Sequence, residues 1–198
     1  MQYEVEQKFP VDDLAKVGAK LAALGGRLET SIDQLDRYFA HPSRDFARTD
    51  EALRIRQVGP RCYVTYKGPK IDLVTKTRRE IELPLSASAD AVAEWTSLLE
   101  ALGFRRVAEV RKQRLPAHLA WQGGDIEVAL DRVVGVGNFV EIELTASAEG
   151  LERAKSRILS LAAALGLSHA ERRSYLELLL ESVRRREPGQ TRPKRPEL

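Results

Sequence analysis

The sequence predicts an α+β fold in which a mostly antiparallel sheet packs against helices. Three observations predict this class. About eight segments alternate apolar and charged residues, about four segments repeat apolar residues at helical spacing, and short turns with glycine and proline join several strands. Because each strand has one apolar face and each helix one apolar stripe, we expect the sheet and the helices to bury these surfaces against each other.

The strands are predicted from alternation, which is clearest in residues 3–9. This segment reads Tyr-Glu-Val-Glu-Gln-Lys-Phe, so its charged side chains share one side of an extended chain and most of its apolar side chains share the other. The other expected strands are residues 33–40, 52–58, 61–68, 75–84, 106–120, 125–131 and 139–144. Residues 135–138, Gly-Val-Gly-Asn, predict a hairpin-like turn before the last strand.

The helices are predicted from apolar residues three and four positions apart, and glycines mark several of their ends. The expected helices are residues 12–24, ended by a glycine pair, 90–102, ended by Gly103, 149–165, ended by Gly166, and 169–186.

The charged faces of the strands carry acidic or basic residues in like-sign pairs. These pairs are Glu4/Glu6, Arg54/Arg56, Glu80/Glu82, Lys112/Arg114 and Glu141/Glu143. Two like charges at alternate positions of a strand lie about 6.6 Å apart, so they are tolerated if both face water or if an opposite charge lies between them. The charged face therefore points to solvent or into a closed barrel. Eight strands can close around one small ligand, and periodicity leaves both arrangements open.

Composition excludes several classes of protein. The 198 residues are 43% hydrophobic, enough for one domain with a full core. Cys62 is the single cysteine, and the three histidines lie far apart without zinc spacing. The sequence has no apolar run that could span a membrane and its N-terminus is too acidic for a signal peptide, so we expect a cytoplasmic protein.

The positive charge of the chain is concentrated at its C-terminus. Residues 184–198 carry a net charge of +4, whereas the whole chain carries +3 and residues 1–183 therefore carry −1. We predict a globular domain over residues 1–183 and a solvated, disordered basic tail over residues 184–198, with a weak nucleic-acid or membrane anchor as the alternative interpretation of the tail. Nucleic-acid binding is not expected of the domain, because only the tail is basic.

An ordered set of motifs resembles the CYTH superfamily, the triphosphate tunnel metalloenzymes. The set begins with the Glu-x-Glu-x-Lys motif of Glu4, Glu6 and Lys8. It continues through Asp36-Arg37-Tyr38-Phe39, Leu53-Arg54-Ile55-Arg56, Tyr66-Lys67-Gly68-Pro69, Arg78-Arg79-Glu80-Ile81-Glu82, Arg111-Lys112-Gln113-Arg114, Asp131, Gly137-Asn138-Phe139-Val140-Glu141-Ile142-Glu143 and Arg173-Ser174-Tyr175. These segments cover residues 2–180, and several are most similar to the class IV adenylyl cyclase branch.

The resemblance implies a closed eight-stranded antiparallel barrel, with about four helices outside it and a tunnel that binds a triphosphate. It implies Mg²⁺ or Mn²⁺ held by Glu4, Glu6, Glu141 and Glu143, since hard cations prefer oxygen ligands; Glu6 and Glu141 match the family's metal carboxylates best. The triphosphate would be bound by Lys8, Arg54, Arg56, Lys67, Lys112 and Arg114, with Lys76 and Arg78 as additions. Asp131, Lys8 and Arg114 are the expected catalytic residues, and Asp131 would orient or deprotonate the nucleophile.

The resemblance leaves the reaction open. In a cyclase, the ribose hydroxyl of ATP attacks the α-phosphorus and pyrophosphate leaves; in a triphosphatase, water attacks the terminal phosphorus of inorganic triphosphate, thiamine triphosphate or a nucleotide. The motif details favour the cyclase. A non-catalytic module that binds polyphosphate or nucleotides is a third interpretation, although binding alone needs no set of four carboxylates. The family also suggests a homodimer.

Overall fold

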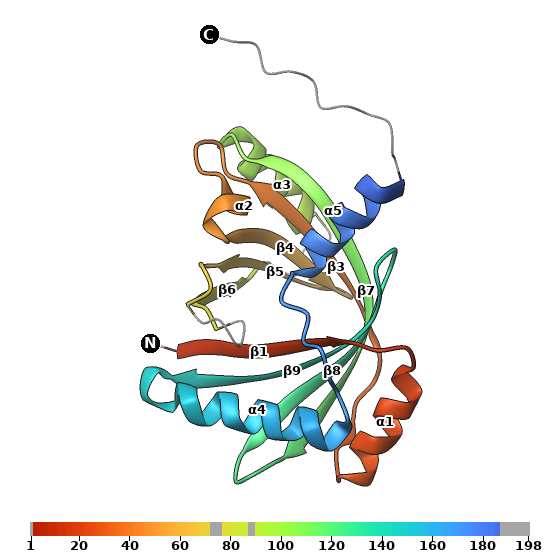
Figure 1. The fold of residues 1–198 in the computed structure, drawn as a ribbon. Helices are drawn as coiled ribbons and strands as arrows, with labels where there is room; N and C mark the ends of the chain where they lie inside the picture. The colour runs from red at the N-terminus through yellow and green to blue at the C-terminus, as the bar shows by residue number, and fades with distance from the viewer. Residues whose placement is uncertain (1, 72–76, 87–89, 187–198) are drawn as a thin grey trace.

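The computed structural model describes residues 2–71, 77–86 and 90–186, and one long antiparallel sheet organises them (Figure 1). The strands are β1 (Gln2–Pro10), β2 (Arg27–Leu28), β3 (Ile32–Ala40), β4 (Ala52–Val58), β5 (Arg61–Lys67), β6 (Glu80–Pro84), β7 (Arg105–Ala120), β8 (Asp125–Val133) and β9 (Gly137–Ser147). Their order across the sheet is β1-β9-β8-β7-β3-β4-β5-β6, and the short β2 pairs with β7 beside this path. The predicted α+β class is therefore confirmed.

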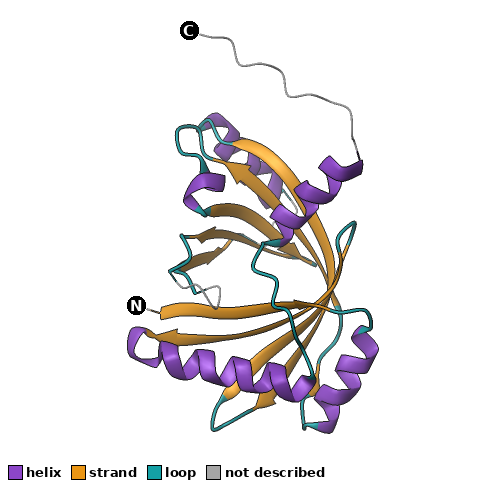
Figure 2. Cartoon of the chain, viewed as in Figure 1, coloured by secondary structure: helices purple, strands orange, loops and turns teal. Residues whose placement is uncertain are grey.

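The sheet curls strongly into a half-barrel, and the predicted closed barrel is not what the structure shows (Figure 2). Its two edge strands are β1 and β6. The contact described between these edges is one bridge in which the backbones of Glu4 and Arg78 exchange two N–H···O bonds of 3.3 Å. Among the described residues, no ladder between β1 and β6 extends from this bridge, and β6 begins at Glu80. The expected strand over residues 75–84 is correspondingly shorter, and its first two residues lie outside the described ranges.

Five α-helices are described, one more than predicted. They are α1 (Leu14–Ala23), α2 (Phe46–Thr49), α3 (Ala91–Ala101), α4 (Leu151–Leu165) and α5 (Tyr175–Arg186), with a 3₁₀ turn, η1 (Ala148–Gly150), before α4. The single-turn α2 is too short to show a helical period in the sequence, although Asp45 caps it by accepting from the backbone N–H of Ala47 at 3.2 Å. The last helix starts six residues later than predicted, because residues 169–174 form an irregular connection in which His169 has a φ angle of +61°.

The largest hydrophobic core lies on the convex side of the sheet, under α1 and α4 (Figure 1). Val5 and Ile142 from the sheet are fully buried there against Leu21 of α1 and Ile158 of α4. Covering this face with helices leaves the charged face on the concave side. A smaller core around Phe39, Ile55 and Leu99 holds α3 to β3 and β4.

The segment between α4 and α5 crosses the open side of the half-barrel, and α5 lies at the upper part of the sheet (Figure 1). The backbone N–H of Glu171 donates to the carbonyl of Lys8 at 2.7 Å, which ties this segment to β1. Tyr175, at the start of α5, then packs with Tyr38 and Phe139 in a second small core. This connection brings the C-terminal part of the domain to the concave face.

Two further sequence predictions concern the chain termini and membranes. The helix α5 continues through Arg186, so the first three arginines of the predicted tail are helical, and residues 187–198 lie outside the described ranges. None of the helices in the described ranges is long and apolar enough to cross a membrane.

Candidate active site

The concave face of the sheet holds a cavity of about 310 Å³ that we call the ionic cavity. Every strand except β2 contributes to its lining, as do Ser174 and Tyr175. The basic side chains in the lining are Lys8, Arg54, Arg56, Lys67, Arg78, Lys112 and Arg114, and the acidic ones are Glu4, Glu6, Glu80, Glu82, Glu127, Glu141 and Glu143. A cavity with so many charges and so little apolar surface is suited to an ionic ligand rather than to an apolar one.

The charges in the ionic cavity are sorted by strand. Carboxylates dominate β1, β9 and β8, whereas β4 and β7 contribute two cations each. Register produces this sorting, because Glu6 pairs directly with Glu143, and Glu143 in turn with Glu127. Like charges directly opposite each other destabilise a sheet, so this acidic wall favours a cation among its members.

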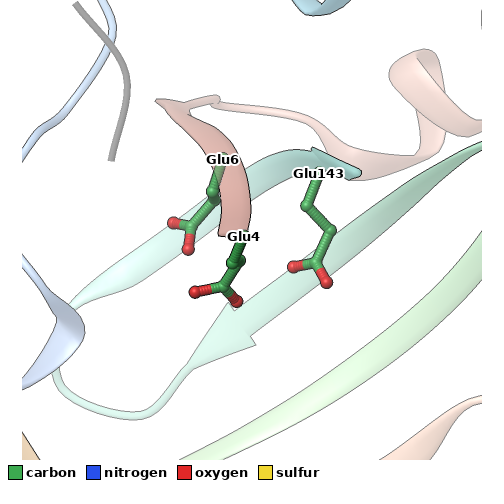
Figure 3. Close-up of side chains that lie close together, drawn as sticks. All are labelled: Glu4, Glu6 and Glu143. Atoms are coloured by element: carbon green, nitrogen blue, oxygen red, sulfur yellow. The ribbon is translucent and has the colours of Figure 1, made fainter. Parts of the chain in front are cut away.

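Three carboxylates of the acidic wall could hold a divalent metal ion. Glu4 and Glu6 on β1 and Glu143 on β9 each have an oxygen within 4.8 Å of the others, and their side chains extend to the same side of the strands (Figure 3). Burial, together with the charge of Glu4, raises the pKa of Glu143 to about 8. A pKa this high indicates that the positive charge near Glu143 does not offset its burial and the repulsion from Glu4. The donor set therefore fits Mg²⁺ or Mn²⁺, which are oxygen-binding cations.

One of these carboxylates already has a cation beside it. Lys67 donates to both oxygens of Glu4, at 3.0 and 2.8 Å, and lies 2.6 Å from Glu80. Burial alone would lower the pKa of Lys67, but the charges of Glu4, Glu80 and Glu6 together outweigh burial and raise that pKa. A metal ion at this site would therefore share Glu4 with Lys67.

We call the four cations of β4 and β7 the basic wall: Arg54, Arg56, Lys112 and Arg114. A buried carboxylate holds the two arginines of β4. Asp36 of β3 accepts from Arg54 at 3.2 Å and from Arg56 at 2.7 and 2.8 Å. Burial would raise the pKa of Asp36, but the two guanidiniums hold it well below its usual range. The Nε of Arg54 is buried without a hydrogen-bond partner among the described residues. An unpaired buried donor is costly, so it favours an anionic ligand at this position.

A second buried carboxylate organises the cations of β7. Asp131 accepts from Lys112 at 3.0 Å, from Arg114 at 2.8 and 2.6 Å, and from the hydroxyl of Tyr175 at 2.9 Å. It is completely buried and does not line the ionic cavity. Asp131 therefore holds these cavity-lining groups in place through its hydrogen bonds, and its expected catalytic role stays a prediction.

Glu141 lies apart from the three clustered carboxylates. It lines the ionic cavity, but its Oε2 accepts a short hydrogen bond from Arg114 and lies 4.0 Å from Lys112. The cause is register, since Glu141 stands opposite Lys8 and Glu143 stands opposite Glu6. The structure thus clusters Glu143 with Glu6, and the expectation that Glu6 and Glu141 are the best-matched metal ligands stays a prediction.

Lys8 is buried at the base of the ionic cavity, with an exposed fraction of 1%. Its ammonium donates to the carbonyl of Arg173 at 2.5 Å and lies 4.0 Å from the ring centroid of Tyr175. The same ring lies 5.0 Å from the ammonium of Lys112. Tyr175 therefore contacts two cations through its ring and donates to Asp131 through its hydroxyl. The Arg-Ser-Tyr motif in the sequence includes Tyr175 but did not predict these contacts.

Most of the predicted phosphate-binding residues lie in the ionic cavity. Of the eight basic candidates, Lys76 lies outside the described residues and the other seven line the cavity. Glu127 and Thr65 also line the cavity but are not among the predicted site residues. Both stand on expected strands at alternate positions to residues already chosen, so the parity of the strand could have found them.

The concave face of the strongly curled sheet thus places a carboxylate cluster beside a basic wall, and these groups could hold a divalent cation and a polyanion. Comparison with known families agrees: the CYTH domain matches residues 2–175. The chain belongs to the CYTH family.

Two close relatives and one more distant structure span nearly the whole chain. A Methanocaldococcus jannaschii protein named "Putative adenylate cyclase MJ0240" is 38% identical over 178 residues, which cover 88% of this chain and 97% of that protein. The structure of PH1819 protein from Pyrococcus horikoshii is 38% identical, with a TM-score of 0.79 over 90% of this chain and 98% of that one. The structure of a "putative adenylate cyclase" from Vibrio parahaemolyticus is 23% identical, with a TM-score of 0.75 over 90% and 98% of the two chains, and shows the shared fold.

Proposed function

We propose that this protein is a divalent-metal-dependent enzyme that binds a triphosphate in the ionic cavity and converts ATP to cyclic AMP and pyrophosphate. The observation that carries the proposal is the sorting of charges in one cavity. A triphosphate bears several negative charges and needs cations from several directions, which the basic wall offers. The carboxylate cluster of Glu4, Glu6 and Glu143 lies in the same cavity and would hold the metal. The name of the Methanocaldococcus jannaschii relative favours the cyclase outcome.

In this reaction a bond forms between the ribose 3′-oxygen and the α-phosphorus, and the bond from that phosphorus to the pyrophosphate oxygen breaks. A bound metal would neutralise charge on the phosphate oxygens. Among the chain's own residues, Arg54 would donate through its unpaired Nε, and Lys8 and Arg114 would balance the charge that develops on pyrophosphate. The described lining of the ionic cavity contains no histidine, so one of its carboxylates is the proton acceptor that the chain offers.

The proposed substrate site is the concave face of a half-barrel rather than a closed tunnel. The bridge between Glu4 and Arg78 spans the gap beside the metal-binding carboxylates. Closure of the remaining edge is not needed for the proposed contacts, because every group invoked already lines one cavity.

A triphosphatase is the second candidate, because the charges that line the ionic cavity suit either reaction. The lining of the ionic cavity addresses phosphate groups and metal, and this chemistry is the same whether water or a ribose hydroxyl attacks. An inorganic triphosphate would satisfy the basic wall as well as ATP does. The two candidates therefore differ in the nucleophile and in what lies beyond the phosphates.

Product analysis separates these functions. The purified protein would be incubated with ATP, thiamine triphosphate or inorganic tripolyphosphate, each with Mg²⁺ or Mn²⁺, and the products resolved by chromatography. Cyclic AMP with pyrophosphate supports the cyclase, and orthophosphate supports the triphosphatase. Binding that needs no metal and gives no turnover of any substrate would refute both enzymatic functions. The variant Glu6→Gln serves as the metal-site control and should lose turnover while remaining folded.

A further inference from the structure

The backbone carbonyl of Arg173 meets a cation of the ionic cavity from the segment between α4 and α5. It accepts the hydrogen bond of 2.5 Å that the ammonium of Lys8 donates. Lys8 lines the ionic cavity and is buried. Because a lysine ammonium ends a flexible stem and carries three rotatable donors, its acceptor helps to decide where its charge lies. The position of this carbonyl therefore bears on how Lys8 would meet a phosphate group.

A carboxylate of α5 acts on this carbonyl through a single peptide group. The N–H of Ser174 belongs to the same peptide group as the carbonyl of Arg173, and it donates to the Oε2 of Glu177 at 2.6 Å. A peptide group is planar, so a hydrogen bond that fixes its N–H also fixes its carbonyl. An acceptor on the N–H also polarises the carbonyl oxygen, because hydrogen bonds in a chain strengthen one another. Glu177 therefore both orients and strengthens the acceptor of Lys8.

The same two residues form the N-terminal cap of α5. The N–H of Glu177 donates to the Oγ of Ser174 at 3.1 Å, and the N–H of Leu178 donates to the carbonyl of Ser174 at 3.0 Å. This reciprocal arrangement of a serine and a glutamate three residues later is a capping box. A capping box stabilises a helix wherever it occurs, but here the capped peptide group also carries the acceptor of Lys8.

A second carboxylate holds the backbone on the other side of Arg173. The Oε1 of Glu171 accepts from the backbone N–H of Arg173 at 2.8 Å and from its Nε at 2.9 Å. The backbone N–H of Glu171 donates to the carbonyl of Lys8 at 2.7 Å. Lys8 is thus joined to this segment through its backbone and through its ammonium, and the residue between these two contacts is fixed by Glu171 and Glu177.

We propose that Glu177 and Glu171 are positioning residues for Lys8, because they hold the backbone N–H groups of Ser174 and Arg173 and so keep the Arg173 carbonyl directed at the ammonium. This inference rests on the proposed function, in which Lys8 balances charge on the phosphates. It gives two carboxylates that do not line the ionic cavity a part in triphosphate affinity.

Affinity for inorganic tripolyphosphate tests this role, because that ligand consists of phosphate groups alone. Kd would be measured with Mn²⁺ by calorimetric titration for Glu177→Ala, Glu177→Gln and Glu171→Ala, and folding checked by circular dichroism. Glu181→Ala is the matched control. Glu181 also contacts the guanidinium of Arg173, but the backbone N–H groups of Arg173 and Ser174 donate to the other two carboxylates.

We expect Glu177→Ala and Glu171→Ala to raise Kd by about threefold to tenfold, the range that corresponds to the loss of one hydrogen bond. Glu177→Gln should recover most of the affinity, because glutamine also serves in a capping box. The Glu181→Ala control should stay within about twofold of the unmodified protein. In a Lys8→Ala background, Glu177→Ala should cause no further loss, since residues that act through one contact are not additive.

A full loss on adding Glu177→Ala to Lys8→Ala would overturn the inference, because the effect would then not pass through Lys8. Equal losses in the Glu181→Ala control, or no loss in folded Glu177→Ala and Glu171→Ala, would overturn it as well.

The NMR signal of the Lys8 ammonium, assigned by its absence in Lys8→Ala, provides a test without any triphosphate. It should shift or broaden in Glu177→Ala and stay unchanged in Glu181→Ala. An unmodified protein that binds no triphosphate would refute the proposed function. An unchanged Lys8 signal in Glu177→Ala would overturn the positioning role whatever the protein binds.

Discussion

The substitution Asp131→Asn tests how the cations of β7 are held. Asp131 is fully buried, and the side chains of its partners Lys112 and Arg114 have exposed fractions of only 2% and 8%. The amide of asparagine has almost the same size but no charge, and its NH₂ group cannot accept from a cation. Removing one partner of a buried ion pair costs about 3–5 kcal/mol. Because Glu141 still contacts Arg114, we expect a loss near the lower limit, about 3 kcal/mol.

This loss is large enough to measure by thermal unfolding. For a chain of this size, each kcal/mol shifts Tm by about 2–4 °C, so the variant should unfold about 6–12 °C below the unmodified protein. Asp125→Asn is the matched control, because Asp125 lies on the same strand with its side chain exposed.

The deficit should also depend on pH. Burial, and then the charge of Arg114, lower the pKa of Lys112, while Asp131 counteracts them. Without Asp131 that pKa falls further below its value in the unfolded chain, so the folded state binds fewer protons and its stability rises with pH. The deficit should therefore be larger near pH 6 than near pH 10. A Tm equal to that of the Asp125→Asn control across this range would refute the reasoning, since it would mean that the two cations do not depend on Asp131.

Three other predictions concern charged residues in or beside the ionic cavity. Glu6→Gln should weaken Mn²⁺ affinity by about tenfold or more, measured by calorimetric titration, and unchanged affinity would remove Glu6 from the metal site. Asp36→Asn should destabilise the protein at neutral pH; because the arginines hold the pKa of Asp36 below its ordinary value of about 3.9, the difference from the unmodified protein should shrink only as pH falls below that value. A difference in Tm that shrank between pH values of about 7 and 5 would contradict this assignment. Lys8→Ala should raise KM for triphosphate substrates, and unchanged kinetics would show that Lys8 does not contact phosphate.

Alternation along the sequence was sufficient to identify most of the charged face. The expected strands over residues 3–9, 52–58 and 139–144 all lie within observed strands, and their charged residues point into one cavity. The reason is local: side chains of an extended chain alternate sides whatever the strand pairs with. The helices over residues 90–102 and 149–165 were equally accessible, because their apolar stripes and terminal glycines are local signals.

Elements too short to show a repeat could not be predicted from the sequence. The helix α2 spans only Phe46–Thr49, and β2 spans only two residues, so neither can show a repeat. The helix α2 nevertheless lines a cavity of about 500 Å³. In the turn between β8 and β9, Gly135 and Gly137 adopt φ angles of +74° and +140°, and this turn sets the register of β9. The glycine-rich turn was visible in the sequence, but the register that it produces was not.

By itself, the sequence determined the fold class, the charged face and the family, because alternation, helical periodicity and ordered motifs are properties of a single chain. Tertiary structure decided which charges meet. Pairing placed Glu143 beside Glu6 and Glu141 beside Lys8, and left the sheet as a half-barrel joined across its gap by one bridge. It also buried Asp131 beneath Tyr175, a residue 44 positions away. Strand register and burial thus made some carboxylates members of a cluster, others partners of cations and others buried supports, and both depend on the whole chain.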